Sequence, residues 1–444
     1  MFELNKETEI VSQELVQRVK KNFGESQVLI VSNNKAMRNN IKRVFVTLGF
    51  PISSIGIAED YKTAKEALEE HSPNIIISNY ALEGASVVDL RNLHFELQAN
   101  RLKSLFFIVT ELDSPALKNL EYDYDLDGVL TGVQNFQTTL DYFTEKFEKR
   151  VSVTKSTLFI FKIMELLNQG HAEKAKSFLD AANEIEIHDL QKEIITAKIN
   201  IALNNYDEAQ LSLQKIIELD NTNYYALTEI INIFYNQRNF EQAFKYVIQF
   251  TKNYIPSTNK LPNILKILLF NKANIEVVKI CEIFKNDDDI DQQTKLNIAA
   301  ALALAGKALI KDKPNLANDA LNDSIAISGG QNFNILQMVI NSIIDESENY
   351  DLAQKFIEKY RHNYTDIKPF LALEFDVFKR SRNAGEIFKE GIELIKNDIK
   401  SFNIYDSLIS ASVLMGRRPE AIEDLVFEAC REFPDFCDQF KSHL

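Results

Sequence analysis

The stretch from residue 155 to residue 440 repeats one pattern about every 34 residues. Ala175, Ala209 and Ala243 follow one another at this interval, and each lies in a similar run of residues with helical spacing. A unit of this length forms one pair of helices, which cannot bury its apolar face alone, so neighbouring pairs must stack. The period therefore predicts an all-α array. It also accounts for a total of only 13 Gly and 9 Pro, because short connections between helices need few turn residues.

Later positions continue the period less regularly. The interval between Val277 and Ala353 is somewhat longer than two periods. We therefore expect additional residues near 285–293 or 311–315, and about eight helix pairs in all. The later equivalents of Ala243 are Val277, Ala317 or Ala320, Ala353, Ile387 and Ala421.

The segment Asn205 to Asn223, NYDEAQLSLQKIIELDNTN, resembles the second half of a tetratricopeptide repeat. In that family a small residue, here Ala209, lets two helices approach closely. The resemblance implies a right-handed α-solenoid over residues 151–444, with a concave groove that binds another protein. In this register the groove positions are Gln191, Lys198, Tyr225, Asn232, Tyr235, Asn236 and Lys266. The alternative for each of them is an ordinary solvated position. The Lys, Asn and Arg set of the family's clamp for carboxy-terminal peptides is not present.

Residues 26–150 follow a different pattern, in which short apolar runs alternate with helical segments. The expected strands are 27–32, 54–58, 74–78, 105–110 and 128–130, and the clearest helices are 35–48 and 61–71. Alternation of this kind predicts a parallel sheet with helices on both faces. The chain as a whole is therefore expected to be α/β followed by all-α. Parallel sheets of this type place their sites at the carboxyl ends of the strands.

The stretch PNIIISNYALEGASVVDL, residues 73–90, is similar to the third strand and following loop of the receiver domains of two-component response regulators. This resemblance implies a flavodoxin-like, doubly wound sheet. The family's acidic pair after the first strand falls on Ser32 and Asn33, and its phosphoacceptor aspartate falls on Asn79. The hydroxyl residue after the fourth strand is present as Thr110, whereas the family's lysine falls on Gly132.

These departures predict a degenerate receiver that is not phosphorylated by the usual route. Magnesium is bound through carboxylates, which these positions lack, and an amide cannot form an acyl phosphate. The alternative is an unusual acceptor site that uses Glu59, Asp60 or Asp113. Without phosphorylation, such a domain could dock a partner or simply cap the helical array.

Other sequence features exclude several classes of function. The net charge of −14 argues against binding to nucleic acid backbones, and no apolar stretch reaches the length of a membrane helix. There is no phosphate-binding glycine loop and no His or Cys pair at metal-ligand spacing, so we expect no cofactor, no metal and no enzymatic activity. The three cysteines are interpreted as buried or inert thiols in a reduced cytoplasm.

Three local expectations complete the prediction. An amphipathic helix at about Lys6–Asn22, within an N-terminal segment 1–25, packs on the receiver or mediates a homodimer. Residues Phe136–Met164 form one long helix that joins the receiver to the array. The acidic run at 287–291 is a solvated loop rather than a calcium site.

Together these features favour a non-catalytic signalling adaptor of a bacterial two-component-type pathway. Its receiver-like domain would dock a histidine kinase, another response regulator or a motility or pilus component, and its groove would hold a second protein. The alternative is a phosphorylation-dependent response regulator with a helical-repeat output.

Overall fold

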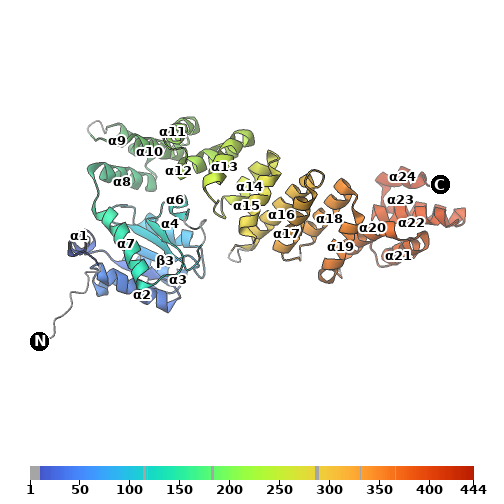
Figure 1. Ribbon diagram of the computed structural model, residues 1–444, viewed down its shortest axis with the longest axis horizontal. Coiled ribbons are helices and arrows are strands. Elements are labelled where there is room, and N and C mark those ends of the chain that lie inside the picture. Colours follow the sequence, from blue (N-terminus) through green and yellow to red (C-terminus); the bar gives the residue numbers. More distant parts are fainter. Residues whose placement is uncertain are drawn as a thin grey trace. The chain divides into compact units, whose positions relative to one another are not determined.

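The computed structural model describes residues 11–113, 117, 119–181, 185–285, 290–330, 332–365 and 367–444. The chain forms two compact units, Met1–Lys260 and Leu261–Leu444. The first unit contains the sheet and the helices up to α13, and the second contains α14 to α24 (Figure 1). The expected boundary at residue 150 thus lies inside the first compact unit.

The N-terminal part is built on a five-stranded parallel sheet. Its strands are β1 Val28–Val31, β2 Ile55–Ala58, β3 Ile75–Asn79, β4 Leu105–Val109 and β5 Gly128–Leu130. They pair in the order β2-β1-β3-β4-β5, which is the doubly wound order of flavodoxin-like folds. The expected strands are confirmed to within one or two residues at each end.

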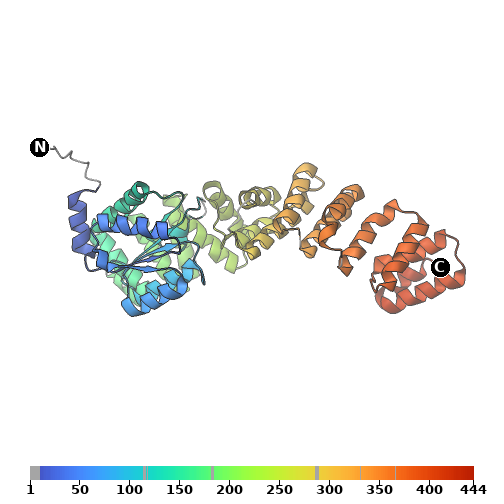
Figure 2. The same ribbon diagram turned by 90° about the horizontal axis from the view of Figure 1, so that it is seen from below.

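Helices cover both faces of this sheet, as Figures 1 and 2 show. They are α1 Gln13–Phe23, α2 Lys35–Thr47, α3 Tyr61–His71, α4 Val87–Leu97, α6 Leu120–Asp123 and α7 Phe136–Val151. Alternate strand residues enter two separate cores, because successive side chains point to opposite faces. In β3, Ile75 and Ile77 pack with α1, α2 and α7, whereas Ile76 packs with α3 and α4.

The helix before the sheet and the helix after it were both predicted from the sequence. Of the helix expected at about Lys6–Asn22, residues 6–10 lie outside the described residues. In the described part, α1 begins at Gln13 and packs on α7, where the ring centroids of Phe23 and Phe147 lie 5.5 Å apart. The packing alternative for this helix is therefore confirmed. A single helix over 136–164 is wrong: α7 ends at Val151, and α8 begins at Lys155, where the Thr154 hydroxyl accepts from the backbone N–H of Thr157. A capping threonine starts a new helix at this point.

Consecutive helix pairs make up the rest of the first unit. In the first unit the pairs are α8 Lys155–Asn168 with α9 Ala172–Asp180, α10 Asp189–Ala202 with α11 Tyr206–Leu219, and α12 Tyr224–Asn236 with α13 Phe240–Asn253. Each helix packs against the other helix of its pair. Ala175, Ala209 and Ala243 are fully buried, and each is the fourth residue of the second helix in its pair.

The second unit continues with helix pairs. They are α14 Leu261–Phe270 with α15 Asn274–Phe284, α16 Gln292–Leu309 with α17 Pro314–Ile327, α18 Phe333–Ser347 with α19 Tyr350–Tyr360, α20 Lys368–Phe378 with α21 Ala384–Lys396, and α22 Phe402–Leu414 with α23 Pro419–Glu432. Successive first helices, from α14 to α22, also pack on one another. The short helix α24, Cys437–Lys441, follows α23.

The structure refines the later repeat positions. Ala317 is the fourth residue of α17 and is the equivalent of Ala353 in α19. In α23 this place is taken by buried Ile422, while Ala421 is exposed, so the choice of Ala421 was wrong by one residue. The helix α16 has 18 residues against 13 in α12. Part of the additional length therefore lies inside a helix rather than in a loop. Residues 287–289 of the acidic run lie outside the described residues.

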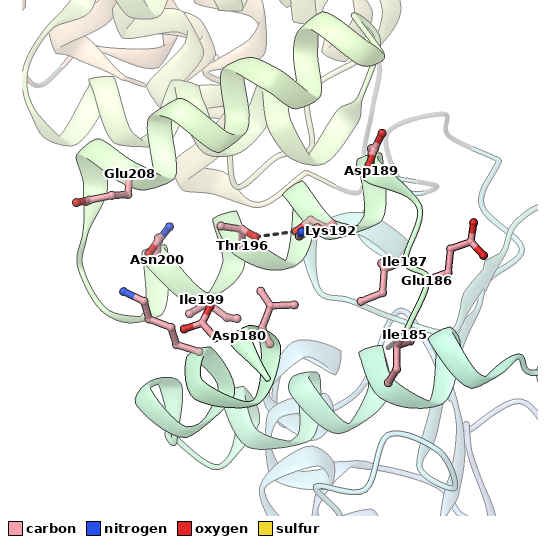
Figure 3. A pocket seen from close by; sticks show the side chains of 12 residues that line it. Asp180, Ile185, Glu186, Ile187, Asp189, Lys192, Thr196, Ile199, Asn200 and Glu208 are labelled. Atoms are coloured by element: carbon pink, nitrogen blue, oxygen red, sulfur yellow. Dashed lines mark hydrogen bonds between the residues drawn. The ribbon is translucent and has the colours of Figure 1, made fainter. Parts of the chain in front are cut away.

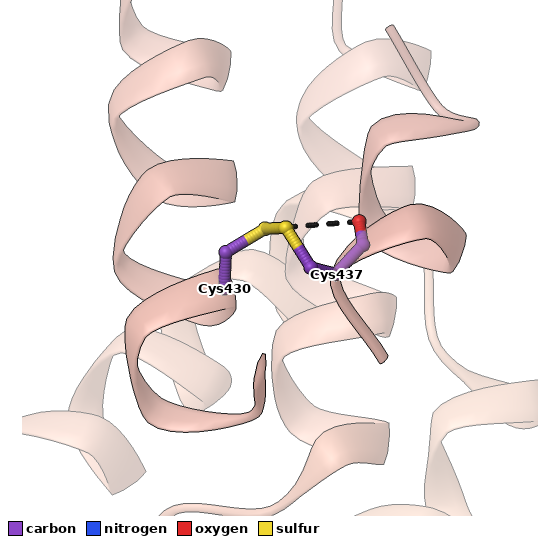
Figure 4. The surroundings of a disulfide bond; sticks show 2 residues. All are labelled: Cys430 and Cys437. Carbon is purple, nitrogen blue, oxygen red and sulfur yellow. Dashed lines mark hydrogen bonds between the residues drawn. A yellow bond between two sulfur atoms is a disulfide. The ribbon is translucent and has the colours of Figure 1, made fainter. Parts of the chain in front are cut away.

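The cysteines do not all remain thiols. Cys430 and Cys437 form a disulfide that joins the end of α23 to the start of α24 (Figure 4), so their interpretation as inert thiols is wrong. Cys281 is a free, buried thiol, and burial raises its pKa to about 12. None of the described helices has the length and apolar character that a membrane span requires.

Candidate functional site

The polar residues singled out in the sheet domain lie together at its carboxyl edge. Ser32 follows β1 directly, Asn79 ends β3 and Thr110 follows β4. The strand register pairs Val31 with Ser78 and Asn79 with Val109. Neighbouring strands are about 4.8 Å apart, so these three residues are adjacent along one edge. The strand ends that carry these residues are therefore neighbours, as the expected parallel sheet requires.

The side chains after β1 are engaged by their own chain. Ser32 is buried, and its hydroxyl accepts from the backbone N–H of Asn34 at 3.1 Å. Asn34 in turn caps α2, because its side-chain oxygen accepts from the N–H groups of Ala36 and Met37. Asn33 is exposed. Ser32 and Asn33, where the resemblance to receivers would place acids, thus serve the strand-to-helix turn or face solvent.

The far side of the edge also has local uses for its polar groups. The Thr110 hydroxyl accepts from the N–H of Leu112 at 3.2 Å, and its carbonyl accepts from Gln134 Nε2 at 2.6 Å. Gly132 has φ of +84°, a conformation that favours glycine. A lysine at this position would be strained. Because the residue is a glycine, the side chain that would supply a cation in a receiver is missing here.

The three acids considered as substitutes each have another partner. Glu59 Oε1 pairs with Arg38 Nη2 at 2.8 Å, and Asp113 Oδ1 accepts from the Thr131 hydroxyl at 3.4 Å. Asp60 caps α3, and the hydrogen bonds from Thr63 lower the pKa of this carboxyl. Across the described ranges no three His, Cys, Asp or Glu side chains are grouped so that they could hold a metal ion.

Of the groove positions, the structure brings Lys198 and Tyr225 into contact. Lys198 on α10 places its Nζ 5.0 Å from the ring centroid of Tyr225 on α12. Asn232 lies on the same face of α12 as Tyr225, two turns further along the helix. Gln191 and Asn236 are exposed, and Tyr235 is partly exposed. Lys266 is an exposed residue of α14 in the second unit.

Sequence reasoning missed a contact between the sheet domain and these helices. The side chain of Asp123, at the end of α6, is only 1% exposed. Its carboxylate accepts from the Tyr224 hydroxyl at 2.6 Å and from the Ser257 hydroxyl at 2.5 Å, and lies 3.1 Å from Lys260 Nζ. The sequence feature that could have indicated this contact is the acidic and aromatic run EYDYD, residues 121–125, which belongs neither to a strand nor to a long helix.

Residues beside Asp123 extend this contact. Asn119 Nδ2 donates to the carbonyl of Ile255 at 2.7 Å, and Asn259 Nδ2 donates to the Tyr124 hydroxyl at 2.7 Å. The rings of Tyr122 and Tyr224 lie 5.1 Å apart. Burial, followed by the charge of Asp123, raises the pKa of Tyr224. This hydroxyl therefore stays protonated and donates a hydrogen bond to Asp123.

A charge cluster borders the same contact. Asp125 lies 3.9 Å from Lys198 Nζ and 3.8 Å from Arg101 Nη2, and Asp127 lies 3.6 Å from Arg101 Nη1 and 3.5 Å from Arg150 Nη2. Partial burial raises the pKa of Asp125, but the charges of Lys198 and Arg101 outweigh this and hold it below its usual value. The carboxylate is therefore charged at neutral pH and attracts the groove lysine.

A pocket of about 610 Å³ lies between α9, α10 and α11 (Figure 3). Its lining includes Lys176, Asp180, Asp189, Lys192 and Glu208. The hydroxyl of Thr196 donates to the carbonyl of Lys192 in its own helix, at 2.8 Å. Small-molecule sites are mostly apolar. The charged residues of this lining make it more similar to a protein contact surface.

No known family model matches the chain, and no curated protein is significantly similar to it. The structure alone therefore carries the assignment of a five-stranded parallel sheet followed by paired helices.

Proposed function

We propose that this protein is a non-catalytic signalling adaptor. Its sheet domain would be a degenerate receiver that docks a signalling protein, such as a histidine kinase, another response regulator or a motility or pilus component. Its helix pairs would form a right-handed tetratricopeptide-like solenoid whose groove binds a second protein. Activity would consist of bringing partners together, independently of phosphorylation.

The observation that carries the proposal is the carboxyl edge of the sheet. Ser32, Asn79 and Thr110 occupy it without a carboxylate, and the Ser32 and Thr110 hydroxyls accept hydrogen bonds from nearby backbone groups. A magnesium ion needs oxygen ligands with negative charge to offset its dehydration. An edge of this composition offers neither the metal site nor the acceptor that phosphoryl transfer to a receiver requires.

The helix pairs support the second half of the proposal. The fourth residue of the second helix is buried in every described pair except α20 with α21, where Ile387 is partly buried. This burial and the packing of the helices within pairs are what a repeat architecture requires. Arrays of this kind commonly use their concave face to bind proteins. Glu59, Asp60 and Asp113, the acids on which a phosphorylation-dependent regulator would have to rely, are bound to Arg38, Thr63 and Thr131.

Affinity capture from native lysate with the full chain tests the adaptor function. The groove variant Asn232→Ala/Asn236→Ala is compared with wild type and with Glu241→Gln, an exposed control on α13. We expect a protein that wild type and Glu241→Gln retain and that the groove variant loses. Retention of the same proteins by all three chains would contradict a role for the groove.

A further inference from the structure

The most distinctive contact outside the sheet edge involves residues 121–125, Glu-Tyr-Asp-Tyr-Asp, all of the first unit. They meet a surface that we call the cradle, which consists of Lys198, Tyr224, Ser257, Asn259 and Lys260. We propose that the cradle is a binding site for acidic, tyrosine-containing protein segments, which residues 121–125 occupy within the same chain. This inference rests on the proposed adaptor function and names the chemistry of one partner.

Four successive side chains of the segment each have a partner in the cradle. Asp123 and Asp125 each face a lysine, Lys260 at 3.1 Å and Lys198 at 3.9 Å. Tyr122, which precedes Asp123, lies against the ring of Tyr224. Tyr124, between the two aspartates, accepts a hydrogen bond from the side-chain amide of Asn259. Recognition therefore alternates between ring and carboxylate, which a random acidic segment would not satisfy.

The electrostatics of the cradle require an acidic occupant. Lys260 Nζ also lies 5.8 Å from the ring centroid of Tyr224, and Lys198 Nζ lies 5.0 Å from that of Tyr225. The Lys198 and Lys260 side chains are only 24% and 17% exposed. Positive charges that are partly removed from water need carboxylate partners. Glu229 on α12 also interacts with both lysines, but burial raises the pKa of its carboxyl. An apolar or basic segment would leave the lysines without the two carboxylates that residues 121–125 supply.

The contact between residues 121–125 and the cradle is of a kind that a competing segment can displace. Its links are mostly hydrogen bonds and ion pairs, and polar interfaces between domains of one chain resemble transient protein interfaces. Attachment in the same chain gives residues 121–125 a high effective concentration, in the millimolar range for flexible links. A partner segment of the same chemistry would compete with residues 121–125 for the cradle.

A labelled peptide of residues 119–126, NLEYDYDL, tests the inference by fluorescence anisotropy on full-length chains. Wild type should bind it weakly, because the cradle is occupied. Asp123→Ala/Asp125→Ala removes both carboxylates that hold the segment in place but leaves the cradle intact, so its affinity should be about tenfold higher or more. Adding Lys198→Ala and Lys260→Ala should abolish this gain. A peptide with Asn in place of its Asp residues is the matched control.

The inference is overturned if the released variant, folded by circular dichroism and thermal melting, binds the peptide no better than wild type. It is also overturned if the gain survives loss of both lysines. Tyr122→Ala provides a second released variant if the first does not fold. A released variant that still captures its lysate partner but not the peptide contradicts this inference alone. A released variant that captures neither the lysate partner nor the peptide contradicts the adaptor proposal as well.

Discussion

Single residues at the carboxyl edge of the sheet serve the local backbone there. The hydroxyl of Ser32 and the amide of Asn34 hold the turn from β1 into α2 together. Gly132 adopts a positive φ that a lysine would not favour. Each of these residues is therefore compatible with the local backbone.

A buried histidine gives the first prediction at this scale. His94 is fully buried between Phe95 and Phe106, and within the described structure its ring nitrogens have no hydrogen-bond partner. Burial, and then the charges of Arg101 and Arg91, lower its pKa to about 3. Between pH 6.5 and 3 the unfolded chain thus binds a proton that the folded chain does not. His94 should therefore reduce the free energy of unfolding by up to about 1.4 kcal/mol for each unit of pH below 6.5.

Urea denaturation at pH 7.5, 6.5, 5.5 and 4.5 measures this effect (the chosen pH values bracket the ordinary histidine pKa of about 6.5). The variant His94→Leu should lose stability less steeply with falling pH than wild type. His71→Gln, at an exposed histidine, should follow the wild-type curve. Parallel curves for wild type and His94→Leu would show that the buried ring is not responsible.

At the scale of elements, the turns between paired helices carry the period of the array as clearly as the alanines do. Gly170, Asn204, Arg238 and Lys272 all have positive φ, between 57° and 73°, and recur at the same interval as Ala175, Ala209 and Ala243. At the end of α12, the N–H of Arg238 donates to the carbonyl of Tyr235, and that of Asn239 donates to Phe234. These bonds form a helix-ending motif that usually contains glycine. The chain is poor in glycine partly because other residues adopt this conformation.

Substitutions at two of these turns should have opposite effects. Arg238→Gly relieves a left-handed conformation that costs a non-glycine residue about 1–2 kcal/mol, although glycine loses more entropy on folding. We expect a net stabilisation of about 0.5–1 kcal/mol. Gly170→Ala should destabilise by about 1 kcal/mol through backbone strain alone, since an added Cβ there meets no atom within 4 Å. Urea midpoints of the two variants test the pair, and a shift in the same direction for both would refute the explanation.

The disulfide at the end of the chain stabilises a single element. It joins Cys430 to Cys437 across a short loop, next to Phe440 of α24, which is fully buried. Closing a loop of this size contributes about 2–3 kcal/mol in the chain-entropy model. Cys437→Ser should therefore increase amide hydrogen exchange in α24 and lower the stability of the second unit by about that amount. Cys430→Ser, which breaks the same bond, should have the same effect, and unchanged exchange in α24 would contradict the prediction.

Elements with a strong local pattern could be predicted from the sequence, and those set by single capping residues could not. The five strands and the helix 61–71 follow from apolar runs and helical spacing. The break at residues 152–154 does not interrupt that spacing, because it depends on Thr154 as a cap. The shift from Ala421 to Ile422 arises because α23 begins three residues after Gly416, whereas α9 begins two residues after Gly170.

For the whole molecule, sequence reasoning grouped residues within each part of the chain but did not predict the contact between the sheet and the helix pairs of the first unit. It grouped Ser32, Asn79 and Thr110, because the ends of parallel strands always lie together. It also predicted Lys198 and Tyr225 as neighbouring groove positions, and the structure shows these two side chains in contact. Nothing local indicates that Asp123 approaches Lys260, which lies far later in the sequence, because such a contact depends on the relative placement of the sheet and the helix pairs.

The absence of a phosphorylation switch is the central claim, and incubation of the full chain with acetyl phosphate and Mg²⁺ tests it most directly by intact mass. A phosphorylatable receiver treated in parallel serves as the positive control. We expect no phosphoryl adduct, because Ser32, Asn33 and Asn79 offer neither a metal ligand set nor an acceptor carboxylate. A stoichiometric adduct that disappears when Glu59, Asp60 or Asp113 alone is replaced would contradict the account.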